Sequence, residues 1–230
     1  MLEVRDLEAY YGESQALRSI SFDVAKGEIV TLIGRNGAGK STTLKSIMGD
    51  ISCRRGRIVF DGIDLVALAP ERICKLGVGF VPEDRGIFAT LTVLENLAIA
   101  RRRPQMAWSL NDIFSLFPVL RQRANQKASL LSGGEQQMLA IARPLYMGSR
   151  FLLLDEPTEG LAPVIIDAIG KIILQLKQLG LTILLVEQNL RFATALADRH
   201  YLIENGRIVK AMTNAEMADQ ERALLEHLGV

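Results

Sequence analysis

The sequence predicts an α/β fold with a mostly parallel sheet, a smaller antiparallel β portion and an inserted group of helices. Three observations predict it. Short apolar runs alternate with helix-like segments before residue 92 and again after residue 146. Between residues 92 and 146 the strand signals vanish, and apolar residues recur with helical spacing. Hairpin patterns near both ends of the chain indicate the antiparallel portion.

The first part of the chain is expected to hold several strands and one helix. Leu2–Leu7 and Ser19–Val24 alternate apolar and polar residues, as half-buried strands do. The apolar run Glu28–Ile33 leads into a glycine-rich loop, after which a helix is expected over Lys40–Met48. Two further strands are expected at Arg57–Phe60, before the turn Asp61-Gly62, and at Val78–Val81, before Pro82.

Strands resume after the helical insert. Phe151–Leu154 and Thr182–Val186 are continuously apolar, which is typical of parallel strands covered on both faces. The segment between them, Ile165–Leu179, has helical spacing. The remaining elements are expected to be strands at Tyr201–Ile203 and Arg207–Val209 around an Asn-Gly hairpin turn, and a polar helix from about Asn214.

The composition is that of an ordinary globular protein. The 230 residues, 49% hydrophobic and 23% charged, fit one domain with an inserted subdomain. A net charge of +1 gives no overall attraction to nucleic acid or anionic lipid. Cys53 and Cys74 are too few for a disulfide framework, and no signal peptide or membrane span is recognisable. We therefore expect a cytosolic protein that works at a membrane only by docking onto a partner.

The strongest motif is a phosphate-binding loop. Gly34–Ser41 reads GRNGAGKS, which matches G-x-x-x-x-G-K-[ST] between an expected strand and an expected helix. Its glycines let backbone N–H groups close around phosphate oxygens, and the helix N-terminus favours an anion. Lys40 would reach the β- and γ-phosphates, and the Ser41 hydroxyl would ligate Mg²⁺. The expected ATP-contacting residues here are Gly34, Asn36, Gly37, Ala38, Gly39, Lys40, Ser41 and Thr42.

Two adjacent carboxylates end the apolar strand at Phe151–Leu154. Unpaired acids at the rim of a core are costly unless a cation uses them. Asp155 suits the Mg²⁺ shell, and Glu156 suits polarising an attacking water. A helix cap or a salt-bridged rim is the other interpretation, and the phosphate loop makes it the weaker one.

A third motif, LSGGEQQ at Leu131–Gln137, permits two interpretations. Ser132 and Glu135 have the spacing of a capping box ahead of a helix over Met138–Tyr146. The two glycines at a helix start also leave backbone N–H groups available to an anion. We expect the N–H and the hydroxyl hydrogen of Ser132 to face a nucleotide.

The three motifs, in this order and over this length, resemble the nucleotide-binding subunits of ABC (ATP-binding cassette) transporters. The resemblance covers residues 1–230, and LSGGEQQ is its diagnostic element. It implies a P-loop NTPase core of ABC type over residues 1–91 and 147–230, with a helical subdomain over 92–146 that carries the signature. It implies a head-to-tail dimer in which Ser132, Gly133 and Gly134 of one copy contact the γ-phosphate held by Lys40 of the other. It also implies that Tyr11 stacks on adenine, although Tyr10 could do so instead, and either could be a core tyrosine.

The chain departs from the general ABC pattern at three positions. Glu83 stands where most members have a glutamine that contacts Mg²⁺, and a glutamate can still ligate the ion. Gln188 stands where most have a histidine, and its amide can donate to the γ-phosphate without titrating. Ala162 replaces an aspartate, which puts one contact across the dimer in doubt. The two histidines of the chain, His200 and His227, are interpreted as ordinary surface or packing residues.

These departures together resemble one subfamily, the ATPases of branched-chain amino-acid importers of the LivF type. Two positions do not fit it, because Asp84 stands where that group usually has glycine and Pro144 interrupts the run after the signature. Importers of urea and short amides are close enough to be confused with it. The resemblance implies a peripheral subunit on the cytoplasmic face of the cell membrane. Its partners would be a second ATPase subunit, integral permease subunits near Glu83 and the helical insert, and indirectly a solute-binding protein.

Two rival functions remain from the sequence. One is a non-transport ABC ATPase acting on nucleic acid or ribosomes. Such proteins usually carry two cassettes or a long coiled-coil insert, and neither is recognisable in this sequence. The basic runs Arg54-Arg55 and Arg101–Arg103 also lack the interleaved aromatic residues of many nucleic-acid-binding surfaces. No nucleic-acid partner is therefore expected. The other is a silent cassette, against which the intact Lys40, Asp155 and Glu156 argue.

Overall fold

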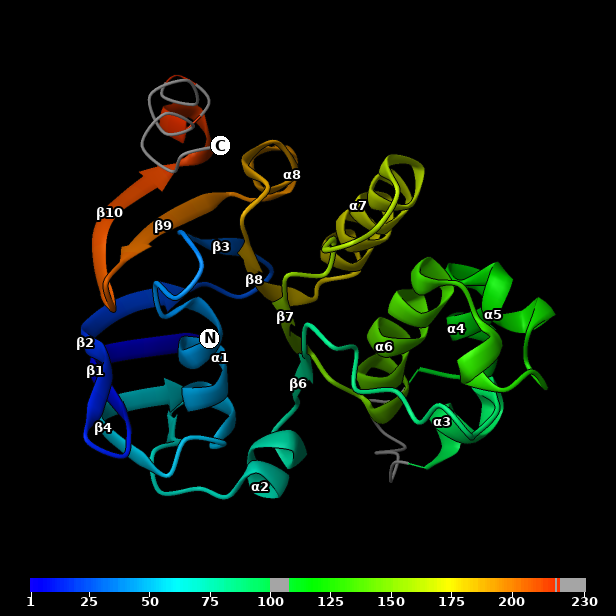
Figure 1. The fold of residues 1–230 in the computed structure, drawn as a ribbon, viewed down its shortest axis with the longest axis horizontal. Coiled ribbons are helices and arrows are strands. Elements are labelled where there is room, and N and C mark those ends of the chain that lie inside the picture. Colours follow the sequence, from blue (N-terminus) through cyan, green and yellow to red (C-terminus); the bar gives the residue numbers. More distant parts are fainter. Residues whose placement is uncertain (100–107, 218, 220–230) are drawn as a thin grey trace.

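The computed structural model describes residues 1–99, 108–217 and 219, whose strands form two sheets (Figure 1). The smaller sheet is antiparallel with the order β2-β1-β4-β5, and the larger has the order β10-β9-β3-β8-β7-β6. In the larger sheet only β10, at one edge, runs antiparallel to its neighbour. The strands are β1 (Leu2–Tyr11), β2 (Ser14–Val24), β3 (Ile29–Ile33), β4 (Cys53–Phe60), β5 (Ile63–Asp64), β6 (Val78–Val81), β7 (Phe151–Asp155), β8 (Thr182–Glu187), β9 (Arg199–Glu204) and β10 (Arg207–Thr213). The predicted mostly parallel sheet with an antiparallel portion is confirmed.

The first two strands are longer than the alternation of residues predicts. β1 pairs with β2 on one side and with β4 on the other, and both ladders continue as far as Tyr10. Its register with β2 shifts between Val4 and Leu7 and again on either side of Ala9. The pattern identified the first six residues of β1 and the last six of β2, and it missed the rest of each strand.

The central strands contribute side chains to two separate hydrophobic cores. Alternate side chains of β7 and β8 point to opposite faces of the sheet, because side chains along a strand alternate. On one face Leu154 and Leu185 join a core built with α6 (Gly133–Met147) and α7 (Pro163–Gln178). On the other face Leu153 and Leu184 join a core with α1 (Lys40–Met48) and the antiparallel sheet. Burial on both faces explains why these strands are continuously apolar.

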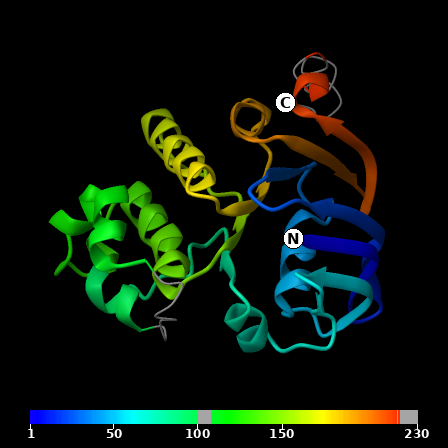
Figure 2. The same ribbon diagram turned by 180° about the vertical axis from the view of Figure 1, so that it is seen from behind.

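Between β6 and β7 the described residues form helices and no named strand. These helices are α3 (Val93–Ala98), α4 (Leu110–Leu116), α5 (Pro118–Gln122), the short 3-10 helix η1 (Ala128–Leu130) and α6. Both views put this group on the side of the large sheet that is remote from the antiparallel sheet (Figures 1 and 2). Thr92, Ser109 and Ser132 each start a helix with a complete capping box.

Pro144, which interrupts the pattern that the resemblance implies, has a structural partner. It lies inside α6, where it cannot donate a helical hydrogen bond. Its ring packs on β6 at Gly79, where an added Cβ would lie only 2.6 Å from the Cβ of Pro144. The glycine in the strand therefore makes room for the proline in the helix.

Several smaller elements were not expected. α2 (Pro70–Lys75), α8 (Leu190–Leu196) and β5 are each short, and their signals are weak in the sequence. The polar helix expected from Asn214 is described over residues 214–217. His200 is fully buried, so it is a packing residue and not a surface one. His227 and Arg101–Arg103 lie outside the described residues. Among the residues described, every helix is too short or too polar to cross a lipid bilayer.

Candidate functional site

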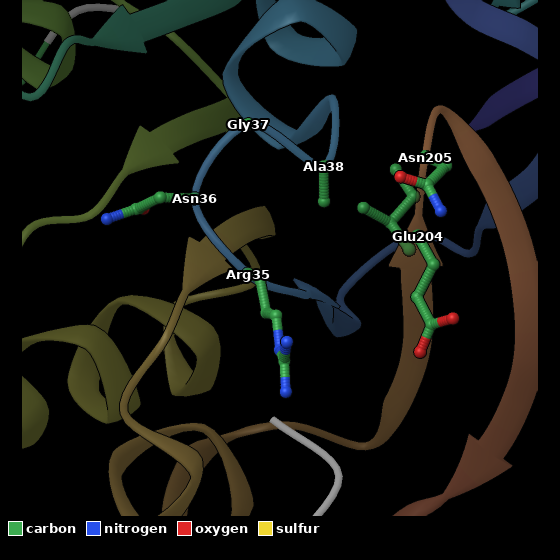
Figure 3. A pocket seen from close by; sticks show the side chains of 7 residues that line it. Arg35, Asn36, Gly37, Ala38, Glu204 and Asn205 are labelled. Carbon is green, nitrogen blue, oxygen red and sulfur yellow. The ribbon is translucent and has the colours of Figure 1, made fainter. Parts of the chain in front are cut away.

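The glycine-rich loop is a tight cradle between β3 and the N-terminus of α1. Gly37 and Gly39 adopt φ values of 78° and 108°, which favour glycine. A Cβ on Gly34 would lie 2.3 Å from the carbonyl oxygen of Ile203. The loop is thus pressed against the β9–β10 hairpin, and Figure 3 shows Arg35 to Ala38 lining one side of a hollow with Glu204 and Asn205 opposite.

Lys40 is held inside this cradle. Its Nζ donates to the carbonyl oxygens of Gly34 at 2.8 Å and Arg35 at 3.1 Å. It also lies 3.2 Å from Oε1 of Glu156, and both side chains are more than nine-tenths buried. A buried ammonium needs such partners. An anionic group in the cradle would compete with Glu156 for the same cation.

Ser41 and Asp155 meet although they are far apart in sequence. The Ser41 Oγ donates to Asp155 Oδ1 at 2.8 Å. Burial raises the pKa of Asp155 to about 6, and the nearby carboxylates of Glu156 and Glu83 add to the rise while the Ser41 hydrogen bond opposes it. A divalent cation would remove this penalty on the charged form. The hydroxyl and the carboxylate are thus together where both could hold one hard cation.

Glu156 is fixed from two sides. It has a left-handed φ of 43°. Besides the pair with Lys40, its Oε2 accepts from Nε2 of Gln188 at 2.6 Å, and that same amide nitrogen donates to Oδ1 of Asn36 at 2.6 Å. Gln188 therefore joins the carboxylate that ends β7 to the phosphate loop after β3.

A pocket of about 490 Å³ opens over these groups. Glu83, the acid after β6, lines it together with Lys40, Ser41 and Glu156. Part of the wall was not expected from sequence and comes from the start of β2 and the β9–β10 turn. The additional lining residues are Ser14, Gln15, Ala16, Arg18, Asn205 and Gly206.

Two further acids accompany the site. The pKa of Glu159 is raised by burial and by the carboxylates of Glu83 and Glu156. Glu187 is 2% exposed, and burial raises its pKa to about 7. Its Oε1 accepts from the Thr158 hydroxyl at 2.8 Å. Glu159 could have been found from the sequence, because it lies in the acid-rich stretch around Thr158. Nothing in the sequence near Glu187 indicates that this residue contacts Thr158 on another loop.

The two candidate stacking residues differ in their surroundings. The Tyr10 hydroxyl donates to Glu8 at 2.9 Å, and the guanidinium of Arg55 lies 5.8 Å from its ring centroid. Tyr11, at the end of β1, is 51% exposed. Tyr11 is the more accessible ring, so stacking on adenine by Tyr11 stays the prediction.

The signature residues lie at the start of α6 and do not line this pocket. Ser132 forms the full capping box, because its Oγ accepts from the Glu135 N–H at 3.3 Å and its own N–H donates to Glu135 Oε2 at 2.7 Å. The expectation that this N–H faces a nucleotide is wrong for the structure described, since the Glu135 carboxylate takes it. The hydroxyl hydrogen is not used by the cap. Gly134 is required by packing, since an added Cβ would lie 2.6 Å from Ile165.

Ala162 occupies the position where an aspartate was expected. It is the N-cap residue of α7 and gives no side-chain cap, while Pro163 takes the first helical position. The helix therefore starts without the carboxylate that could also have reached a second copy.

Comparison with known proteins identifies the family. The sequence model of the ABC transporter family matches residues 17–159. The chain is 46% identical over 232 residues to the high-affinity branched-chain amino acid transport ATP-binding protein BraG of Pseudomonas aeruginosa, and the match spans all of both chains. The chain belongs to the ABC transporter family. The cassette is therefore a nucleotide-binding domain.

Two more comparisons bear on the cassette. It is 39% identical to the probable branched-chain amino acid transport ATP-binding protein LivF of Archaeoglobus fulgidus, over 96% of each chain. It superimposes with a TM-score of 0.80 on a dimeric ATP-binding cassette bound to ADP and Pi in a post-hydrolysis state, at 25% identity over 93% of this chain and 99% of that one. The predicted family, ABC ATPase fold and resemblance to branched-chain amino-acid ATPases are confirmed.

Proposed function

We propose that this chain hydrolyses ATP to energise an ABC importer of branched-chain amino acids. The observation that carries the proposal is that Lys40, Ser41 and Glu156 line one pocket. Asp155 joins them by accepting from the Ser41 hydroxyl. The end-to-end similarity to BraG supports the solute class, because its name gives branched-chain amino acid transport. Importers of urea or short amides are the alternative that the sequence left open.

Glu156 is the residue best suited to polarise the attacking water. Its carboxylate is oriented by Gln188 and held near Lys40, so it has a defined position before substrate arrives. The phosphates of ATP would draw the Lys40 ammonium away from Glu156, since they offer it more negative charge. That exchange would free the Glu156 carboxylate to accept a proton from water.

The donor set fits Mg²⁺. The Ser41 hydroxyl and the Asp155 carboxylate, already 2.8 Å apart, would hold it, and Glu83 at the pocket wall could add a third oxygen. When bound, the ion would neutralise the negative charge that develops on the transferred phosphoryl group. Here Glu83 would bring one more negative charge than the glutamine of most related cassettes.

A dimer would complete the site. The N-terminus of α6 carries Ser132, Gly133 and Gly134, and none of them lines the pocket of its own chain. The post-hydrolysis cassette that superimposes on this chain is dimeric. We propose that they contact the γ-phosphate held by a second ATPase subunit, and that residues 92–146 act as the helical subdomain. Integral permease subunits would dock near Glu83 and this subdomain, at the cytoplasmic face of the membrane. The solute-binding protein would connect only through the permease.

The test is co-purification. The Glu156→Gln variant, tagged and extracted in mild detergent with ATP and Mg²⁺, should hold its partners in a stalled complex. Recovery of polytopic membrane proteins, with or without a second cassette, supports the importer. Recovery of nucleic acid or ribosomes without a membrane protein would overturn transport and leave ATP hydrolysis standing. Lys40→Ala is the matched control, because it should weaken ATP binding and reduce ATP-dependent recovery.

A further inference from the structure

The loop after β6 reaches two sites at once. Glu83 lines the nucleotide pocket, and Arg85 lies two residues further along. Arg85 adopts a left-handed φ of 68°, which is unfavourable for a residue with a Cβ. The turn is closed by the Arg85 N–H, which donates to the Pro82 carbonyl at 2.9 Å. This backbone conformation turns the arginine away from the pocket and toward α6.

Arg85 contacts the signature at the start of α6. Its Nη1 donates to Oε1 of Gln136 at 2.9 Å. A Cβ added to Gly133 would lie 3.4 Å from Nη2 of Arg85, so the guanidinium rests against the signature glycine. The arginine therefore fills the space that a side chain at Gly133 would otherwise enter.

Gln136 in turn forms hydrogen bonds to the backbone at the start of the signature. Its Nε2 donates to the carbonyl oxygens of Leu131 at 3.3 Å and Ala128 at 3.2 Å. The Leu131 carbonyl belongs to the same planar peptide group as the Ser132 N–H. A shift of Arg85 that moved Gln136 would therefore reorient the peptide that presents Ser132.

A second attachment holds the loop along the same helix. The Arg143 guanidinium, two turns beyond Gln136 on α6, donates to the Gly86 carbonyl and stacks on the Phe88 ring at 4.9 Å. Asp84 accepts from the Gly86 N–H at 3.1 Å and has no positive φ, so glycine is not needed at that position. The segment from Asp84 to Phe88 therefore follows the pocket residue Glu83 directly and is attached to α6 at both of these contacts.

From these contacts we infer that Arg85 is a positioning residue that couples the nucleotide pocket of a chain to the signature which that chain presents to its partner. The inference rests on the proposed function, in which Glu83 touches bound Mg²⁺ and Ser132 touches the partner's nucleotide. Occupancy of the pocket would shift Glu83, and Arg85 would carry the shift through Gln136 to Ser132. Nucleotide bound to one chain would then orient the signature that this chain presents to the nucleotide of its partner.

Hydrogen exchange measured on a single copy tests this coupling. The full chain is studied dilute, where gel filtration gives the mass of one chain, with and without a non-hydrolysable ATP analogue and Mg²⁺. In the natural sequence, exchange should slow in the phosphate loop and also change at residues 131–137. Arg85→Gln should keep the first response and lose the second. Arg85→Lys, which retains a charged donor, should keep part of it.

A matched control and a second variant guard against misfolding. Arg123→Gln removes an arginine that also reaches the start of α6, through Glu135 at 3.3 Å, but comes from within the helical group. It should keep both responses. Gln136→Met should lose the signature response as Arg85→Gln does.

The outcomes separate the two proposals. If the phosphate loop of the natural sequence does not respond, nucleotide binding fails and the coupling falls with it. If the phosphate loop responds but residues 131–137 do not, the function stands and the coupling is overturned. A signature response that survives in Arg85→Gln or Gln136→Met overturns it as well.

Discussion

Nε2 of Gln188 lies 2.6 Å from Oε2 of Glu156 and donates to it. The resemblance to ABC cassettes implies a histidine at the position that Gln188 occupies. A glutamine amide has no proton to lose near neutral pH, so it remains a donor over the whole working range. The same nitrogen also binds Asn36 of the phosphate loop. Gln188 therefore orients the carboxylate that would polarise water, and does so independently of pH.

The Gln188→Ala variant should turn over ATP about 10- to 100-fold more slowly, the range for a misplaced catalytic group, with little change in ATP affinity. The steady-state rate and the binding constant of a fluorescent nucleotide would be measured separately. Gln188→His offers a second readout. Its imidazole should add a pH dependence near its ordinary pKa of ~6.5 that the natural chain lacks. Unchanged turnover in Gln188→Ala would remove this residue from the mechanism.

The Glu156→Gln variant should lose turnover by ~10²–10⁴-fold, the span of a general base, while still binding ATP. Removing this carboxylate also releases Lys40 from an ion pair of 3.2 Å, so ATP affinity should hold or rise. Glu159→Gln is the matched control, because Glu159 is a neighbouring acid without that ion pair. Its turnover should stay within a few-fold of the natural chain. Single-turnover hydrolysis and equilibrium binding would separate the two effects, and a normal rate in Glu156→Gln would refute its role.

The fold was predictable where burial is regular. β7 and β8 are covered on both faces and read as continuous apolar runs, so their positions were found nearly to the residue. The helix α8 was missed because its seven residues carry too little periodic signal. The last four residues of β1 were also missed, and the register of this strand shifts at three places along its pairing with β2. Local patterns fail where the structure itself is irregular.

The candidate site was predictable as a set of motifs and not as a network. The phosphate loop identified Lys40 and Ser41 because phosphate binding requires those residue types at that spacing. Their partners depend on the order of strands β3, β8 and β7 in the sheet, which brings Asp155 and Gln188 beside the loop. No local signal links Arg85 to Gln136, 51 residues apart. Contacts of this kind follow only from the topology.

Gly34→Ala should weaken nucleotide binding at least about tenfold and destabilise the fold by ~1–3 kcal/mol, the usual cost of overpacking. The new methyl group would lie 2.3 Å from the Ile203 carbonyl oxygen, so the loop or the β9 strand must move. Gly27→Ala is the control, because it changes a glycine with φ of 76° in open space away from the pocket. It should lower stability and leave affinity unchanged. Urea unfolding and nucleotide titration of both variants would test the difference.

His200 should make the protein less stable in mild acid. It is fully buried, its Nδ1 lies 2.6 Å from the Thr31 hydroxyl, and its Nε2 lies 3.1 Å from Asn214 Oδ1. The Asn214 oxygen can only accept, so Nε2 carries the proton and Nδ1 accepts from Thr31. Burial lowers the pKa of His200. Below the ordinary imidazole pKa of ~6.5 the unfolded chain therefore binds a proton that the folded chain refuses.

The contribution of His200 is thus fully present above the ordinary imidazole pKa and is lost as the pH falls from there through the lower folded value. The free energy of unfolding in urea would be compared at about pH 7.5 and about pH 5.5, on either side of that ordinary value. His200→Gln is the matched variant, since its amide can donate to Asn214 and accept from Thr31 without titrating. The raised pKa values of Asp155 and Glu187 act in the opposite direction, but they are common to both proteins and cancel in the comparison. The variant should lose less stability than the natural chain on acidification, and an equal loss in both would show that His200 is not the group responsible.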